Sequence, residues 1–321
     1  MFDIYLGLAI AGGLSVGAFC CAASWGRRAS PRLCDLLAVA LVLALVLFIR
    51  DLWSSQVLAK WLPYSNLIVL GNWMAPTVAL LGGLAWHRVP GRVYRKSLLV
   101  GTLLVIAGYS LVHPLRGEVP RCTNTWRNDV CIQSTNASCS PASAATLLHW
   151  YGISSTEQEM AELCLTRPEG TYWQGLYRGL KLKTRGTPWD VEVFQSHDLL
   201  KLEEQTKSGP VILTVGIPKY GDVNPTYRND WGWVPGVSHS VVLFRFLRFK
   251  QVRVGDPSVD DGMENWSRDD LNVLWLGSGI RLVPRAGTPE HLATLQRQNS
   301  QRQNSLPDSA AVVLPGVLAR F

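Results

Sequence analysis

The sequence lacks the short motifs that mark several common protein classes. It contains no GxxxxGK[ST] phosphate-binding loop, so the chain is not itself an ATP-driven transporter. No spacing of cysteine and histidine resembles a zinc site, and we expect neither a metal nor another cofactor. The soluble part has no basic stripe interleaved with aromatic residues. This absence argues against nucleic-acid binding, although the formal net charge is +7.

Long apolar runs are present instead, and they crowd the first third of the chain. Four segments, near residues 4–25, 33–49, 66–86 and 97–115, each approach the ~20 apolar residues that cross a bilayer. The first segment has no basic region before it, and three more follow, which argues against a cleaved signal peptide. We therefore expect an integral membrane protein in contact with a lipid bilayer.

Basic residues in the short loops predict the orientation, because such residues prefer the cytoplasm. Four arginines or lysines lie in loop 87–96 and three arginines in loop 26–32, whereas loop 50–65 has only Arg50 and Lys60. Both basic loops should then be cytoplasmic. The amino terminus, loop 50–65 and everything after residue 115 should lie outside the cytoplasm.

These patterns divide the chain into three regions. We expect a four-helix transmembrane region over 1–115, a soluble domain over 116–285 and a disordered tail over 286–321. The tail carries a polar direct repeat, QRQNS at 296–300 and again at 301–305, which cannot bury a core.

One stretch of the soluble domain places a thiol at the start of a predicted helix. Pro141 suits a first helical turn, and the Ala-rich run after it continues with apolar spacing to about Tyr151, before Gly152. Cys139 therefore precedes the helix, where unpaired N–H groups and the helix dipole lower a cysteine pKa and favour the nucleophilic thiolate. Six residues upstream, the amide of Gln133 could donate to a developing oxyanion.

The other cysteines allow several arrangements. Cys20, Cys21 and Cys34 fall in or beside the membrane spans, as small apolar fillers. Cys122 and Cys131, nine residues apart, predict a disulfide if the domain faces an oxidising compartment. The alternatives are a pair between Cys139 and Cys164 or between Cys131 and Cys139, either of which would give Cys139 a structural role.

The soluble domain should have helices first and strands afterwards. Helices are expected from Pro141, after the cap Thr156 and from Trp173 to Leu182, with shorter ones at 197–207 and after Ser267. Strands are expected at 191–194, 210–217, 239–246, 252–254 and 280–283. This order indicates an α+β fold with helices packed on an antiparallel sheet.

Two residues of the strand half could complete a site for the thiol. His239 begins a strongly apolar strand, and Asp256 follows the next strand, seventeen residues later. If the two strands form a hairpin, the carboxylate can fix the tautomer and orientation of the imidazole, as a thiol protease requires. Each residue also has a plainer interpretation, a capping histidine and a Gly-Asp-Pro turn. The loop before His239 holds four aromatic residues, which could wall a cleft, form a lid or touch a membrane surface.

In this order, Gln133, Cys139, His239 and Asp256 resemble the papain-like cysteine peptidase domain of bacteriocin exporters, the double-glycine leader peptidases of cysteine peptidase family 39. The resemblance covers about residues 128–285. It implies an oxyanion-hole glutamine at Gln133, the nucleophile at Cys139, the general base and acid at His239 and the orienting carboxylate at Asp256.

The sequence also departs from that family. Members often have Asp-Cys-Gly at the nucleophile, where this chain has Ser138-Cys139-Ser140. The exporters carry the peptidase at the cytoplasmic amino end, whereas here it follows four spans.

Together these features predict a membrane-anchored cysteine peptidase with an extracytoplasmic catalytic domain, in a bacterial cytoplasmic membrane. Its substrate should be a peptide or protein. Two other functions stay open at this stage, a non-catalytic peptide-binding module on a papain-like scaffold and a transpeptidase or transamidase with the same triad.

Overall fold

The amino-terminal third folds into long apolar helices, in a computed structural model that describes residues 1–90, 92–290 and 293. Four helical segments in this part of the chain are long and apolar enough to cross a membrane, namely Phe2–Gly26, Pro31–Leu52, Leu67–Arg88 and Val93–Leu115. They match the four spans expected from the sequence. The third is interrupted at residues 71–73, between α4 (Leu67–Leu70) and α5 (Met74–Arg88).

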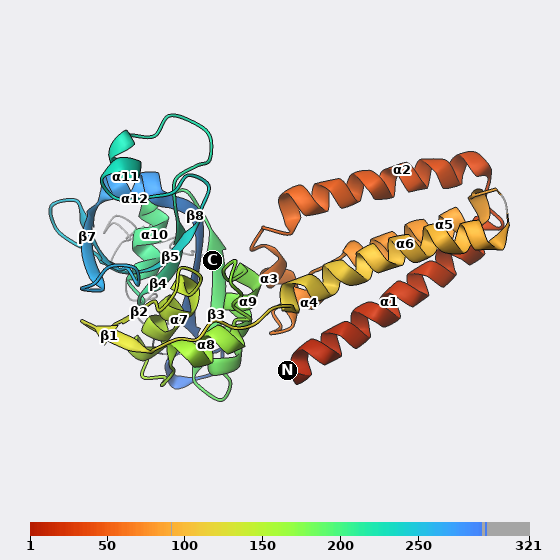
Figure 1. Cartoon of the computed structure of the whole chain (residues 1–321). Coiled ribbons are helices and arrows are strands. Elements are labelled where there is room, and N and C mark those ends of the chain that lie inside the picture. Colours follow the sequence, from red (N-terminus) through yellow and green to blue (C-terminus); the bar gives the residue numbers. More distant parts are fainter. Residues whose placement is uncertain (91, 291–292, 294–321) are drawn as a thin grey trace, which may run out of the picture.

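Three of these helices pack closely, and the fourth stands apart (Figure 1). Helix α5 packs against α1 (Phe2–Gly26) and α6 (Val93–Val112). Gly83 permits the close approach of α1, because a Cβ there would lie 2.8 Å from the Cβ of Ala22. Helix α2 (Pro31–Leu47) diverges from this group, and an ion pair of 2.9 Å between Asp35 and Arg88 joins its start to the end of α5.

The α+β part lies at one end of the helices, on the same side as the amino terminus (Figure 1). Helix α2 continues into a π-helical turn, η1 (Phe48–Leu52), and the segment after it includes α3 (Leu58–Trp61). This segment touches the α+β part, since the Gln174 amide donates to the carbonyl of Trp53 at 2.8 Å. The two arginine-rich loops lie at the opposite end. The amino terminus and the α+β part thus share one end of the helices.

Six antiparallel strands form the main sheet, in the order β3-β8-β4-β5-β6-β7. The strands are β3 (Trp189–Gln195), β4 (Val211–Val215), β5 (His239–Phe246), β6 (Gln251–Gly255), β7 (Met263–Ser267) and β8 (Trp275–Pro284). The alternation along β5 explains how the sheet is covered, because Val241 and Leu243 face one apolar cluster and Val242 faces the other.

Helices cover both faces of this sheet. The cluster that contains Val242 includes side chains of α7 (Cys139–Trp150), α8 (Glu157–Leu163) and α9 (Trp173–Lys183). The cluster that contains Val241 and Leu243 includes side chains of α10 (Leu199–Thr206) and α12 (Arg268–Leu274). The chain thus has four apolar helices followed by an α+β domain, as expected. Thr156 caps α8 as its spacing predicted, accepting a hydrogen bond from the Glu159 N–H at 3.1 Å.

Several elements differ from the sequence-based expectation. A short hairpin of β1 (Thr125–Arg127) and β2 (Val130–Ile132), strand β7 and helix α11 (Pro225–Asn229) were not anticipated. Strand β8 begins five residues earlier than expected, because α12 ends at Leu274 and the chain extends at once. The tail expected from residue 286, with its repeat at 296–305, lies outside the described residues except for 286–290 and 293.

The expected disulfide between Cys122 and Cys131 is wrong in this structure, where all seven cysteines are free. Cys131 is buried on β2, and the Cys122 thiol donates to the carbonyl of Pro120 at 3.6 Å. Burial, reinforced by the nearby Glu157 carboxylate, raises the pKa of each thiol to about 12.

Candidate active site

Cys139 is the first residue of helix α7, so its thiol lies at the positive end of the helix dipole. The side chain is half-buried. Its backbone N–H has no acceptor among the described residues, as expected for the first turn of a helix. The start of α7 therefore offers both a thiol and a free N–H donor.

His239 and Asp256 meet at the edge of the β5–β6 hairpin. Strand β5 begins at His239, β6 ends at Gly255, and the two strands pair antiparallel. The imidazole Nε2 lies 2.8 Å from Oδ1 of Asp256. The same carboxylate oxygen accepts hydrogen bonds from the backbone N–H and the hydroxyl of Ser258, at 2.8 and 2.7 Å. Asp256 is thus fixed in the orientation that holds the ring.

The thiol of Cys139 lies beside the imidazole of His239, close enough for each to shift the pKa of the other, so the hairpin faces the start of α7. Because Asp256 engages Nε2, Nδ1 is the ring nitrogen left for the thiol. Sequence reasoning predicted that these three residues would come together, and the structure places them side by side. The geometry is that of a nucleophile, a base and an orienting acid.

Electrostatics favour the charged form of the pair. Burial lowers the pKa of His239, but its interactions with Asp256 and Cys139 outweigh burial and raise the pKa to about 10. Burial raises the pKa of Cys139, but the neighbouring His239 lowers it below the ordinary value. Burial likewise raises the pKa of Asp256, and the bond to His239 reverses the effect. All three shifts favour the thiolate, the imidazolium and the carboxylate.

Gln133 lies at the same site, in the loop between β2 and α7. Its backbone N–H donates to the carbonyl of Pro257 at 2.9 Å, which joins this loop to the residue after Asp256. The side-chain oxygen Oε1 is buried and has no hydrogen-bond partner in the described chain. Together with the free N–H of Cys139, the Gln133 amide supplies the two donors that an oxyanion hole needs.

A buried carboxylate holds this loop, and sequence reasoning did not find it. Glu157, the first residue of α8, is fully buried. It accepts hydrogen bonds from the N–H of Ser134 at 2.7 Å and from the Ser134 hydroxyl at 2.5 Å. Glu157 therefore fixes the residue next to Gln133. In the sequence, Glu157 follows the capping residue Thr156, so only a local role in the first turn of α8 was apparent. Its contact with Ser134 is visible only in the structure.

Serines stand on both sides of Cys139, at the positions where the peptidase family often has Asp and Gly. Ser140 and Ser240 share a hydrogen bond of 2.8 Å between their hydroxyls, and the Ser143 hydroxyl donates to the carbonyl of Ser240 at 2.9 Å. Ser240 follows His239 directly. These bonds join the first turn of α7 to β5 and so set the spacing between Cys139 and His239.

A groove of about 700 Å³ opens beside the imidazole. Gln133, His239 and Asp256 line it together with Trp231 and Trp233. The Trp233 ring meets the His239 ring edge to face, with centroids 6.0 Å apart. Two aromatic residues of the loop before β5 thus form a cleft wall.

The other two aromatic residues of that loop do not line the groove. Tyr227 is buried, with its hydroxyl bonded to Asp270, and Tyr220 is 81% exposed. Cys164, the alternative disulfide partner of Cys139, is fully buried directly after α8, where α9 approaches, and a Cβ at Gly179 would collide with its sulfur. Among the described residues, no cluster of His, Cys, Asp or Glu side chains is placed to hold a metal ion.

Among known proteins, the chain is similar to several solved structures. No family model and no curated protein match the chain. The peptidase domain of Streptococcus ComA, a bi-functional ABC transporter, matches at 18% identity with a TM-score of 0.38, covering 50% of this chain and 100% of that one. A C39-like peptidase from Bacillus anthracis matches at 16% identity with a TM-score of 0.38, covering 52% and 96%.

A further match is a double glycine motif protease from an AMS/PCAT transporter, solved in complex with its leader peptide. It is 17% identical with a TM-score of 0.37 and covers 53% of this chain and 96% of that one. These matches belong to the peptidase group that the motifs around Cys139 indicated.

Proposed function

We propose that the chain is a membrane-anchored cysteine peptidase. The observation that carries this proposal is the juxtaposition of Cys139 with the Nδ1 side of a ring whose Nε2 is held by Asp256 at 2.8 Å. The α+β domain over about 116–285 would hold the site, anchored by spans within 1–115. The charge of the loops favours placing it outside the cytoplasm.

The reaction follows from the charged pair. The Cys139 thiolate attacks the carbonyl carbon of the scissile peptide bond, and the oxygen that gains charge is stabilised by the Cys139 N–H and the Gln133 amide. The C–N bond breaks as the His239 imidazolium gives its proton to the leaving amine. His239 then takes a proton from water, which attacks the thioester and releases the acid and the thiolate.

The groove indicates an extended substrate. Trp231 and Trp233 line one part of it and Gln133 and Asn136 another, so a peptide can contact both the aromatic wall and the oxyanion donors. A pocket of this size is in the range of roughly 300–1,000 Å³ common for ligand sites.

Substitution of the triad tests the proposal on the full chain in its membrane. A fluorescent thiol-directed activity probe should label the wild type, and Cys139→Ala should abolish both labelling and peptide hydrolysis. Comparing the peptides of cells that carry each form identifies the substrate. His239→Ala should leave almost no turnover, because no acid would protonate the leaving amine. Asp256→Asn should weaken turnover without eliminating it, because a neutral amide can still orient the ring.

Two controls separate catalysis from the other functions. Cys164→Ser alters a buried thiol away from the groove and should keep Cys139 reactive. If Cys139→Ala retained full hydrolysis, the peptidase proposal would fail. Peptide binding without turnover in the wild type would indicate a binding module, and products joined to an added amine would indicate a transpeptidase.

A further inference from the structure

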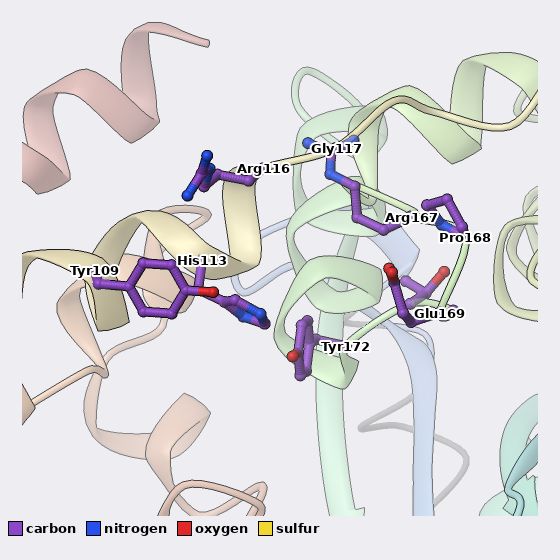
Figure 2. Close-up of a pocket in the computed structure, with 10 residues that line it drawn as sticks. Tyr109, His113, Arg116, Gly117, Arg167, Pro168, Glu169 and Tyr172 are labelled. Atoms are coloured by element: carbon purple, nitrogen blue, oxygen red, sulfur yellow. The ribbon is translucent and has the colours of Figure 1, made fainter. Parts of the chain in front are cut away.

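A second cavity lies where the last apolar helix meets the α+β domain, away from the candidate active site. It has a volume of about 520 Å³ and is lined by Tyr109, His113 and Arg116 on one side and by Arg167, Glu169 and Tyr172 on the other. Figure 2 shows the first three extending from the end of α6 and its continuation η2 (His113–Leu115), facing the loop and helix start that carry the other three.

The charges of this cavity are not neutralised within the described chain. Arg116 forms no hydrogen bond or ion pair there, and its guanidinium lies 6.0 Å from the centroid of the Tyr109 ring. Arg167 is only 8% exposed, and although its terminal nitrogens donate to the carbonyls of Thr166 and Leu115, its Nε has no partner. Glu169 is exposed and forms no direct ion pair with the described residues, although burial lowers the pKa of Arg167 and the charge of Glu169 opposes that shift.

A carboxylate therefore lines the same cavity as two arginines, and among the described residues none of these three side chains is neutralised by a direct ion pair. A ligand complementary to this arrangement carries an anionic group for the arginines and a cationic group for Glu169. Arginine binds phosphate through charge-assisted hydrogen bonds, and a primary ammonium can donate to a carboxylate. The ligand is thus a zwitterion with a phosphate and an ammonium.

The position of the cavity indicates where such a ligand comes from. The fourth apolar helical segment ends at Leu115, next to Arg116, so the cavity lies at the level where a membrane meets water. Tyr109 and Tyr172 are 52% and 41% exposed, and tyrosine is enriched at this level because its ring is apolar and its hydroxyl polar. Phospholipid headgroups occupy the same level, and basic pockets there bind them.

We propose that this cavity binds the headgroup of a phosphatidylethanolamine lipid, with its phosphate near Arg116 and Arg167 and its ammonium at Glu169. The inference requires the apolar helices to span a bilayer, and it is independent of the peptidase proposal. The bound lipid would bridge the last span and the loop before α9.

Native mass spectrometry of the full chain in detergent tests this, with phosphatidylethanolamine, phosphatidylglycerol or phosphatidylcholine added at equal concentration. Phosphatidylethanolamine should bind most tightly, because phosphatidylglycerol lacks the ammonium and the methylated ammonium of phosphatidylcholine cannot donate. Arg116→Gln should weaken phosphatidylethanolamine binding roughly tenfold, the usual scale for losing a hydrogen bond to a charged group.

Two further variants make the test specific. Glu169→Gln should remove the preference for phosphatidylethanolamine over phosphatidylglycerol. Arg121→Gln changes an exposed arginine of the same connecting segment that does not line the cavity, and it should leave binding unchanged. Equal binding of all three lipids by the wild type, or an equal loss in Arg116→Gln and Arg121→Gln, would overturn the proposal. Displacement of the lipid by water-soluble glycerophosphoethanolamine at the lipid's own concentration would also overturn it, since a free metabolite would then be the ligand.

Discussion

The pairing of Cys139 with His239 predicts how the thiol reacts with pH. The imidazolium lowers the pKa of Cys139, so alkylation by iodoacetamide should already be fast at pH values below the ordinary thiol pKa of about 8.5. His239→Gln removes the charge and leaves burial, which raises the pKa, so the midpoint of alkylation should move to higher pH. Mass spectrometry of the Cys139 peptide across a pH series measures this.

Cys122 supplies an internal control, because its pKa is raised to about 12 and it should stay unmodified near neutral pH. The same pair predicts the alkaline limit of activity. Above a pH of about 10, His239 loses the proton that the leaving amine needs, and turnover should fall. An unchanged alkylation midpoint in His239→Gln would contradict the ion pair.

Glu157 should act on catalysis through Gln133. Gln133→Ala should lower turnover by about 10²–10³, the usual loss for one oxyanion donor. Glu157→Gln keeps the shape of the side chain but replaces one acceptor oxygen at Ser134 with a donor, and it should lower kcat by roughly tenfold with little change in KM.

The double variant distinguishes positioning from stability. If Glu157 acts by placing Gln133, Glu157→Gln should cost little more in a chain that already has Gln133→Ala. Additive losses, or a matching fall in thermal stability, would instead assign Glu157 a structural role. Kinetic assays of the four chains, with their unfolding temperatures, decide between these outcomes.

At the scale of elements, a buried ion pair joins the first span to the α+β part. Arg178 on α9 is 1% exposed and donates to both carboxylate oxygens of Asp3 on α1, at 2.7 and 2.9 Å. Arg178→Ala leaves the buried Asp3 with only the amino terminus, 3.5 Å away, as a cationic partner, and it should destabilise the chain by about 3 kcal/mol, the lower end of the range for one half of a buried pair. Thermal unfolding in detergent, followed by protease sensitivity, measures the loss.

The matched control is Arg50→Ala, which breaks the exposed pair with Asp51 and should have no measurable effect. Replacing both partners, by Asp3→Leu with Arg178→Met, should recover much of the stability, because no unpaired charge stays buried. Equal stability of Arg178→Ala and wild type would mean that the two parts do not depend on this pair.

Most elements could be predicted from local pattern, and the failures have physical causes. Strand β5 was predicted at its observed bounds, because an apolar run between turn residues is a strong local signal. The three-residue strands β1 and β2 are too short to show periodicity. The place of β8 between β3 and β4 depends on contacts between distant segments, which no local pattern encodes.

The same distinction applies to the site. Cys139, His239, Asp256 and Gln133 could be identified because each belongs to a recognisable motif. The contacts of Ser134 and Ser240 arise only when loops distant in sequence meet, so their roles appeared only in the structure. The spacing of Cys122 and Cys131 suits a disulfide, but spacing along the chain does not determine whether two thiols bond, and both are free in the structure.

At the scale of the whole molecule, the end of the helices at which each part lies predicts which parts share one side of the membrane. The amino terminus, the segment after α2 and the α+β domain share one end, and the basic loops lie at the other (Figure 1). Alkaline phosphatase fused after residue 290 should be active, because it requires an oxidising compartment, and the same enzyme inserted between residues 28 and 29 should be inactive. The reverse pattern would place the domain in the cytoplasm.

The strand order determines how much of the chain must be synthesised before the main sheet can form. Strand β8 is the last of the sheet to leave the ribosome, yet it lies between β3 and β4 and joins them. Long-range pairings of this kind form late in folding. The helix layer that carries Cys139 rests on both halves of the sheet, so the thiol should stay unactivated until residue 284 has emerged. A chain stopped after Leu274 should accordingly leave Cys139 unlabelled by a thiol probe near neutral pH, whereas one stopped after Glu290 should label fully. On the proposed function, a growing chain would therefore have no peptidase activity until its synthesis is nearly finished.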